Sequence, residues 1–163
     1  MTSFLSTFVN KVDRKGRVSV PAPFRAQLAG QGFHGIIAYP SFTDPAIDAI
    51  GRNLLEQMNK RRFDRTLDDG DFEAVLAGGG GEMVETVMAL AAELPFDGEG
   101  RIVLPPKLAE PAGITEQAAF VGRGSRFQIW APDAFERHQS AAVERVKARL
   151  SERGGSGGSG ENR

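Results

Sequence analysis

The sequence contains no cysteine and has only two histidines among its 163 residues. Without cysteine there can be no disulfide framework, no thiol nucleophile and no thiolate zinc site. The two histidines, His34 and His138, lie far apart and have no partner at metal-ligand spacing, so we expect both to be structural or exposed residues. We therefore predict that the chain binds no metal and no other cofactor.

Long apolar runs are also missing. No stretch approaches the roughly 18 uninterrupted apolar residues of a transmembrane helix, and no basic leader precedes an apolar run at the N-terminus. We therefore expect no membrane contact, no secretory signal and a cytoplasmic location. The composition, 40% hydrophobic and 25% charged, is typical of a globular protein of one domain or two small ones.

Residue patterns typical of enzymes are absent as well. There is no G-x-S-x-G elbow around a serine nucleophile and no G-x-x-x-x-G-K-[ST] phosphate loop. The glycine run at residues 78–81 is followed by glutamate and not by lysine, so we interpret it as a flexible joint. We predict that the chain has no catalytic residues and no small-molecule substrate, and that it is not an enzyme.

The charged residues are unevenly distributed, although the net charge is only −1. Residues 1–43 carry five cations and one acid, residues 65–100 carry one cation and nine acids, and residues 101–163 carry ten cations and seven acids. A basic first segment in a nearly neutral chain favours a localised anionic partner. On charge alone, an ordinary solvated face explains the segregation equally well.

An internal repeat with an offset of 84 residues organises the chain. Residues 12–21 (VDRKGRVSVP) align with residues 96–105 (FDGEGRIVLP), with Asp, Gly, Arg and Pro in register. Each copy predicts a strand, a polar loop, a second strand and then a helical turn that starts at proline, at residues 23–28 and 106–110.

Further strands follow in both halves. Residues 118–122 and 126–130 predict a hairpin around a glycine-containing loop at 123–125. In the first half, residues 35–39 predict the corresponding strand.

Longer helices are predicted from caps and apolar spacing. Asp44-Pro45 is typical of a helix start, and the apolar stripe behind it consists of Ile47, Ile50, Leu54 and Met58. A second helix is predicted from Glu82 to Leu94, with core-facing residues Met83, Val84, Val87, Met88 and Ala91. A third opens at Pro132-Asp133, with an inner face of Phe135, Ala142, Val143, Val146 and Leu150.

The two D-x-x-G-R loops, loop one at residues 13–17 and loop two at residues 97–101, form the candidate site. Gly16 and Gly100 provide the backbone freedom that a tight turn needs, including positive φ. Asp13 and Asp97 can accept hydrogen bonds from loop N–H groups or pair with the arginine four residues further on, so we expect both to be structural. Such a role does not explain Arg14 and Lys15, which we expect at the loop tip, directed at phosphates.

These residues resemble the MraZ family of transcriptional regulators. The resemblance rests on residues 13–25 (DRKGRVSVPAPFR), 97–105 and 120–130 (FVGRGSRFQIW), and it extends from about Phe4 to Leu150. It implies an α+β, β-rich fold of two AbrB-like swapped-hairpin units, of the double-psi barrel type, fused with pseudo-two-fold symmetry and flanked by peripheral helices.

The resemblance also implies a function. The family forms a ring-shaped homo-oligomer that binds duplex DNA at the promoter of its own operon, the bacterial division and cell-wall gene cluster, so we expect a nucleoid-associated repressor. The arginine that ends the first unit contacts DNA in the family, which carries over to Arg17. We assign DNA binding to Arg14, Lys15, Arg17 and Arg101. Because loop one has a net charge of +2 and loop two −1, loop one is predicted to provide most of the affinity. Head-to-tail neighbours in a ring predict direct repeats in the DNA.

Five segments are predicted along the chain. They are repeat 1 at residues 7–54, an acidic helical and glycine-rich junction at 55–90, repeat 2 at 91–134, a C-terminal helix at 135–153 and a disordered glycine–serine tail at 154–163. The alternative to a DNA-binding regulator is an oligomeric protein-interaction scaffold that uses the same fold. An enzyme is a third and disfavoured reading.

Overall fold

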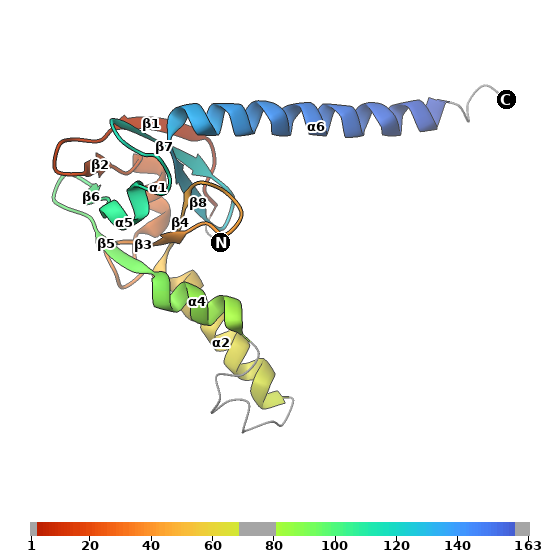
Figure 1. Ribbon diagram of the computed structural model, residues 1–163. Helices are drawn as coiled ribbons and strands as arrows, with labels where there is room; N and C mark the ends of the chain where they lie inside the picture. Colours follow the sequence, from red (N-terminus) through yellow and green to blue (C-terminus); the bar gives the residue numbers. More distant parts are fainter. Residues whose placement is uncertain (1–2, 69–80, 159–163) are drawn as a thin grey trace. The chain divides into compact units, whose positions relative to one another are not determined.

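Six short strands form one antiparallel sheet in the order β1-β7-β8-β4-β3-β5 (Figure 1). The computed structural model describes residues 3–68 and 81–158, and the chain divides into two compact units, Met1–Ala131 and Pro132–Arg163. The six strands are β1 (Thr7–Lys11), β3 (Gly35–Pro40), β4 (Ile47–Ile50), β5 (Ala92–Pro95), β7 (Gln117–Gly122) and β8 (Phe127–Trp130). Strands β2 (Arg17–Ser19) and β6 (Arg101–Val103) pair as a separate antiparallel ladder. The fold is therefore mixed α and β with an antiparallel β part, which confirms the predicted α+β, β-rich class.

The strand order has an approximate two-fold symmetry. If β1 to β4 are exchanged with β5 to β8, the order reads the same from the other end of the sheet. Each half also supplies an edge strand to the other half, because β1 pairs with β7 and β5 pairs with β3. The hairpin predicted at residues 118–130 is confirmed as β7 and β8.

Within the described residues the sheet stays open, so the barrel expected from the family resemblance is wrong. Strands β1 and β5 are the two edges, and each pairs with a single neighbour in the sheet. Closure would require hydrogen bonds between these two edges. Instead, β1 is followed along the chain by β2, and β5 by β6. Strand β2 contacts β1, β6 contacts β5, and β2 and β6 pair with each other.

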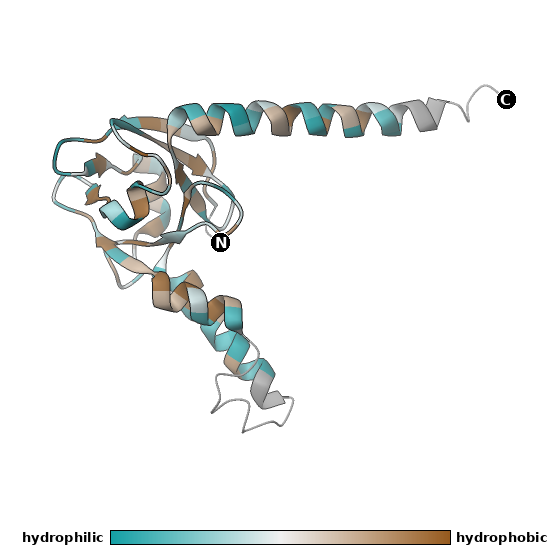
Figure 2. Ribbon diagram, viewed as in Figure 1, coloured by the Kyte–Doolittle hydropathy of each residue, from teal (hydrophilic) through white to brown (hydrophobic). Residues whose placement is uncertain are grey.

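The core is made mainly of aromatic and branched side chains. Hydrophobic residues are frequent in the strands of the sheet (Figure 2). Phe24 of α1 (Ala22–Leu28) packs edge-on against Phe4 and Phe8, with ring centroids 5.3 and 5.5 Å away. Leu108 of α5 (Pro106–Ala109) is its buried counterpart in the second half. The helical turns predicted after each loop are therefore confirmed as α1 and α5.

The helix predicted from Asp44-Pro45 is wrong in its first part, because Ile47–Ile50 is strand β4. All four residues of β4 are buried, between β3 and β8. Apolar residues three apart fit a helix locally, but pairing with two strands decides in favour of extended backbone. The helix, α2 (Arg52–Asp68), begins only after Gly51.

The second predicted helix ends earlier than expected. Helix α4 spans Glu82–Leu90, and β5 begins at Ala92, because Leu94 pairs with Ile36 of β3. Val87 is fully buried against Ile37 and other residues on the second face of the sheet. The side chains of Met83 and Met88 are 65% and 38% exposed, so their predicted core positions are wrong.

Helix α6 (Pro132–Gly158) forms the second unit. Its start at Pro132 agrees with the proline cap, but it extends past residue 153, where a coil was predicted. Glycine disfavours helix by about 1 kcal/mol per residue, so propensity does not explain this extension. Val143, Val146 and Leu150 are exposed, so the prediction that they face a core is wrong.

The remaining expectations lie outside what the fold tests. Gly78, Gly79 and Gly80 and the tail at 159–163 lie outside the described residues, and the domain boundaries stay a prediction. No helix in the described ranges is both long and apolar enough to cross a membrane.

Candidate nucleic-acid interface

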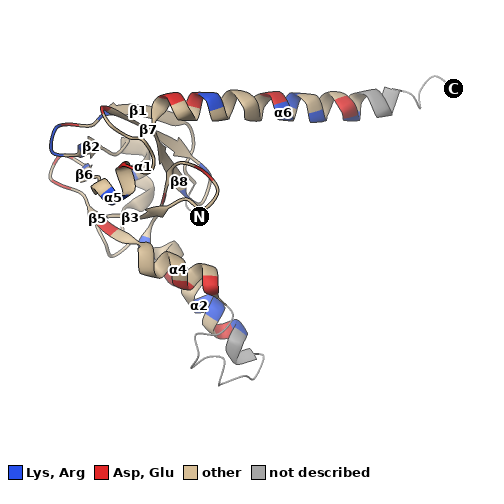
Figure 3. Ribbon diagram, viewed as in Figure 1, with Lys and Arg blue, Asp and Glu red and all other residues tan. Residues whose placement is uncertain are grey.

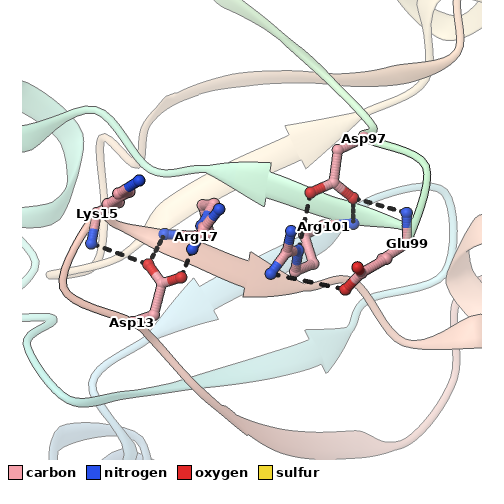
Figure 4. Close-up of polar contacts among 6 residues, drawn as sticks. All are labelled: Asp13, Lys15, Arg17, Asp97, Glu99 and Arg101. Carbon is pink, nitrogen blue, oxygen red and sulfur yellow. Dashed lines mark hydrogen bonds and ion pairs between the residues drawn. The ribbon is translucent and has the colours of Figure 1, made fainter.

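Loop one is a tight turn closed by the carboxylate of Asp13 (Figure 4). Asp13 Oδ1 accepts hydrogen bonds from the backbone N–H groups of Lys15 and Arg17, each at 2.9 Å. Asp13 Oδ2 accepts a third from Arg17 Nε at 2.6 Å. Gly16 has a φ of +79°, and its N–H donates to the Asp13 carbonyl at 3.0 Å. One carboxylate therefore fixes both the backbone of the loop and the arginine that ends it.

Loop two repeats this geometry. Asp97 Oδ1 accepts from the N–H groups of Glu99 and Arg101, each at 2.9 Å, and Oδ2 accepts from Arg101 Nε at 2.8 Å. Gly100 has a φ of +76°. The D-x-x-G-R spacing thus forms the same structure twice, because its hydrogen bonds are local.

The hydrogen bonds stabilise the ionised carboxylates. The pKa of Asp13 is lowered, chiefly by the backbone N–H of Arg17; burial opposes this, and the Arg17 side chain and the N–H of Lys15 lower the pKa further. The pKa of Asp97 is lowered in the same way, first by the N–H of Arg101. The pKa of Arg101 is raised, first by its hydrogen bond to Asp97. Both turns are therefore held by charged groups at neutral pH.

The β2–β6 ladder places both loop arginines on one surface. Arg17 lies opposite Val103, and Arg101 lies opposite Ser19. The central pair of the ladder is buried, so the flanking residues of both strands face outward. Arg17 and Arg101 therefore share the outer face, at opposite ends of the ladder.

Each loop is also anchored to the other half of the chain. The carbonyl of Gly16 accepts a hydrogen bond from the N–H of Leu104 at 2.9 Å. The carbonyl of Gly100 accepts one from the N–H of Val20 at 3.1 Å. Neither loop depends only on its own half for its position.

The loops differ in the charge they present (Figure 3). Arg14 and Lys15 are exposed, and neither side chain pairs with a carboxylate in the parts of the chain that the structure describes. In loop two, Glu99 Oε2 lies 3.6 Å from Nη1 of Arg101, in addition to the Asp97 contact. Loop one is therefore the more available cationic surface.

Two features of this region were not foreseen from the sequence. Arg25 Nη1 donates to the carbonyl of Val20 at 2.8 Å, beside loop two. The two arginines of the loop between β7 and β8 also contact polar groups of the sheet. Arg123 Nε donates to Gln128 Oε1 at 3.1 Å, and Arg126 Nε lies 3.5 Å from a carboxylate oxygen of Asp48. The available signal for the second feature was Gln128, a polar residue in the otherwise apolar segment FQIW.

The described residues contain no group of three or more His, Asp or Glu side chains placed to hold a metal ion.

Sequence comparison relates the chain to a known family. A family model described as "MraZ protein, putative antitoxin-like" matches residues 87–153. A protein named "Transcriptional regulator MraZ" from Rickettsia peacockii (strain Rustic) is 45% identical over 143 residues, which cover 87% of this chain and 90% of the relative. The chain belongs to the MraZ family.

Other relatives with the same name have similar sequence identity to this chain. The protein of the same name from Rickettsia rickettsii (strain Sheila Smith) is 46% identical over the same shares of both chains. The one from Rickettsia bellii (strain OSU 85-389) is 42% identical over 144 residues. The resemblance seen in the loop residues is confirmed, and the name that these relatives carry is that of a transcriptional regulator and not of an enzyme.

Proposed function

We propose that this MraZ-family chain is a sequence-specific DNA-binding regulator that contacts duplex DNA through loop one. The observation that supports this is the combination of exposure and fixed geometry in the loop. Arg14 and Lys15 are exposed and have no carboxylate partner among the described residues, while Asp13 orients Arg17 on the outer face of the ladder. Cations that replace counterions on DNA phosphates provide most of the binding free energy of such proteins.

Arg17 is the residue suited to read sequence. Its Nε is bonded to Asp13, which leaves the two terminal nitrogens to donate outward. A guanidinium in this orientation matches the O6 and N7 acceptors of guanine in the major groove. Arg101 has a second acid, Glu99, beside its Nη1, so it contributes less.

The target and the assembly follow the family resemblance. The chain represses its own operon, the division and cell-wall gene cluster, from a nucleoid-associated cytoplasmic location. One subunit offers few cations, so a ring-shaped homo-oligomer reaches useful affinity by linking several copies. The exposed apolar residues Val143, Val146 and Leu150 of α6 support self-association. The exchange of β1 and β5 between the halves supports two AbrB-like swapped-hairpin units.

The test measures binding to a labelled duplex from upstream of the chain's own gene, at several salt concentrations. For a regulator that binds phosphates, the logarithm of the binding constant falls with the logarithm of the salt concentration, with a slope of about −0.9 per phosphate contact. Footprinting locates the protected repeats. Lys15→Ala lowers the magnitude of the slope by about 1. Lys147→Ala is the control, because Lys147 is an exposed lysine of α6, and it leaves the slope unchanged.

The alternative, a protein-interaction scaffold, is favoured by the same exposed apolar residues of α6. A scaffold retains no DNA at about 150 mM salt, where specific regulators bind with Kd near 10⁻⁸ M or below. Light scattering tests the assembly in the same preparation. A monomer mass at micromolar concentration would contradict the ring.

A further inference from the structure

Val103 is an exposed apolar residue within the cationic surface of the β2–β6 ladder. Its side chain is 53% exposed, although it belongs to strand β6. The outer face of the ladder consists otherwise of Arg17, Ser19 and Arg101. The preceding residue, Ile102, is 1% exposed and is part of the core. Packing in the core therefore explains the isoleucine but not the valine that follows it.

Val103 lies directly opposite Arg17 in the ladder. The hydrogen bond from the Leu104 N–H to the Gly16 carbonyl marks the adjacent pair as a hydrogen-bonded one. Because the two kinds of pair alternate in an antiparallel ladder, Arg17 and Val103 form a non-hydrogen-bonded pair. The Cα atoms of such a pair are about 4.5 Å apart, which is the closer of the two spacings. A ligand on this surface therefore meets the two side chains next to each other.

Val103 also borders loop one, although it comes from the second half of the chain. A Cβ added to Gly16 would lie 3.8 Å from Cγ1 of Val103. The bond from Arg17 Nε to Asp13, 2.6 Å long, draws the guanidinium toward loop one (Figure 4), so the valine side chain stays exposed. The second half thus adds an apolar contact surface to the cationic loop of the first half.

The other end of the ladder has different chemistry. Ser19 precedes Val103 by the repeat offset of 84 residues and lies opposite Arg101. Glu99 also lies beside Arg101, with its Oε2 3.6 Å from Nη1. The same arginine therefore has a valine as its neighbour at one end, and a hydroxyl group and a carboxylate at the other. The apolar neighbour is at the end with the more available cations.

We propose that Val103 is a specificity-determining residue that contacts the C5-methyl group of a thymine in the major groove. This inference rests on the proposed binding of DNA through loop one. The major groove is about 12 Å wide and admits a two-stranded β-ribbon, and thymine presents an apolar methyl group there. When Arg17 contacts a guanine, a side chain about 4.5 Å away faces the next base pair, because successive base pairs are about 3.4 Å apart. The two residues together read a guanine and the adjacent thymine.

The experiment uses the duplex from upstream of the chain's own gene and the same duplex with deoxyuridine in place of thymine. This exchange removes only the C5-methyl groups. Fluorescence anisotropy measures Kd for both duplexes at one salt concentration. Wild type binds the deoxyuridine duplex at least about fourfold more weakly, which is the effect of one buried methyl group. Val103→Ser, which copies the residue at the equivalent position 19, weakens binding to the thymine duplex and binds both duplexes equally.

Val9→Ser is the matched control. Val9 of β1 is 50% exposed and lies outside the ladder, so this variant keeps the wild-type difference between the two duplexes. Val103→Thr keeps the β-branched shape that strands favour and replaces one methyl group. It reduces the difference without abolishing it, and it keeps the test valid even if thermal unfolding shows that Val103→Ser is unstable.

Single replacements then locate the contact. Replacing one guanine at a time with 7-deazaguanine, which lacks the N7 acceptor, identifies the guanine that Arg17 contacts. The thymine whose replacement costs most lies in the adjacent base pair, and any other place would overturn the pairing of Arg17 with Val103.

Two further results would overturn the role of Val103: equal binding of both duplexes by wild type, or a Val103→Ser variant that keeps the wild-type difference. A separate result bears on the proposed function. If wild type binds the upstream duplex no better than a shuffled duplex of the same composition, sequence-specific DNA binding itself is overturned.

Discussion

Asp48 and Gln128 lie directly opposite each other in β4 and β8, and Gln128 Nε2 donates to Asp48 Oδ1 at 2.9 Å. Because β4 and β8 exchange under the approximate two-fold symmetry, this acid–amide pair lies at the centre of the sheet. Gln128 Oε1 also accepts from Trp130 Nε1 at 3.0 Å and from Arg123 Nε at 3.1 Å. A buried polar group whose atoms are all bonded holds two strands in one register more strictly than apolar contacts do.

Gln128→Leu therefore destabilises the fold. The substitution removes a donor to Asp48 and the acceptor of Trp130 in a buried place, which costs about 1–3 kcal/mol of unfolding free energy. Urea unfolding measures the change. Gln117→Leu replaces an exposed glutamine of β7 and changes stability by less than about 0.5 kcal/mol. Equal effects of the two substitutions would show that the buried pair has no special role.

Gly16→Ala tests the backbone of loop one. Gly16 has a φ of +79°, and a Cβ there would lie 3.2 Å from the Leu104 carbonyl oxygen. We expect a loss of about 1–2 kcal/mol, the cost of the left-handed region for a residue with a side chain. Gly98→Ala is the control, because it meets no atom within 4 Å and its φ is outside that region. Thermal unfolding compares them, and indistinguishable midpoints would contradict the strained turn.

Acid weakens the fold through Asp13 and Asp97. Both have a lowered pKa in the folded chain, so the unfolded chain binds more protons between the folded and unfolded values. Their contribution is fully present above the unfolded pKa, near about 4, and is lost as the pH falls through the folded pKa. From pH 7 to 3, the unfolding free energy of the Asp13→Asn, Asp97→Asn double variant therefore falls less steeply than that of wild type.

Asp64→Asn, at an exposed position of α2, is the control and keeps the wild-type slope. A double variant whose curve runs parallel to that of wild type would mean that the two loop carboxylates do not govern the acid response.

The spacing of the DNA repeats tests the head-to-tail ring. Neighbours in such a ring face the same way, so their loops meet direct repeats about 10 bp apart on one side of the duplex. Inserting five base pairs between two repeats turns one of them to the opposite side, and affinity falls sharply in a gel-shift titration. Inserting ten base pairs returns both repeats to the same side of the duplex, and the loss of affinity is smaller. Equal losses would reject direct repeats.

The loops and the repeat could be predicted from the sequence because their causes are local. In D-x-x-G-R the acceptor, the positive-φ glycine and the donor lie within five residues, so the pattern determines the turn. Strand β4 could not be predicted from the sequence, because Ile47 and Ile50 have helical spacing. They form a strand only by pairing with residues such as Ile129 of β8.

Long-range partners also explain the residues that were missed. Arg25 makes its contact beside Gly100, which is 75 positions further along the chain. Nothing in the first half alone indicates that this arginine faces the second loop. Likewise, Gln128 reaches Asp48 only because the two halves meet at the centre of the sheet.

The most direct test of loop one as the DNA-binding element compares Arg17→Ala with Arg101→Ala on one operator duplex at one salt concentration. The two variants are matched, because each removes an arginine Nε bond to the aspartate of an equivalent turn, and their thermal unfolding is measured alongside. We predict that Arg17→Ala raises Kd about 10- to 100-fold, as the loss of one base contact does, and that Arg101→Ala raises it less than about threefold, within the range of a peripheral charge. An equal or larger loss of affinity in Arg101→Ala would contradict the assignment of DNA binding to loop one.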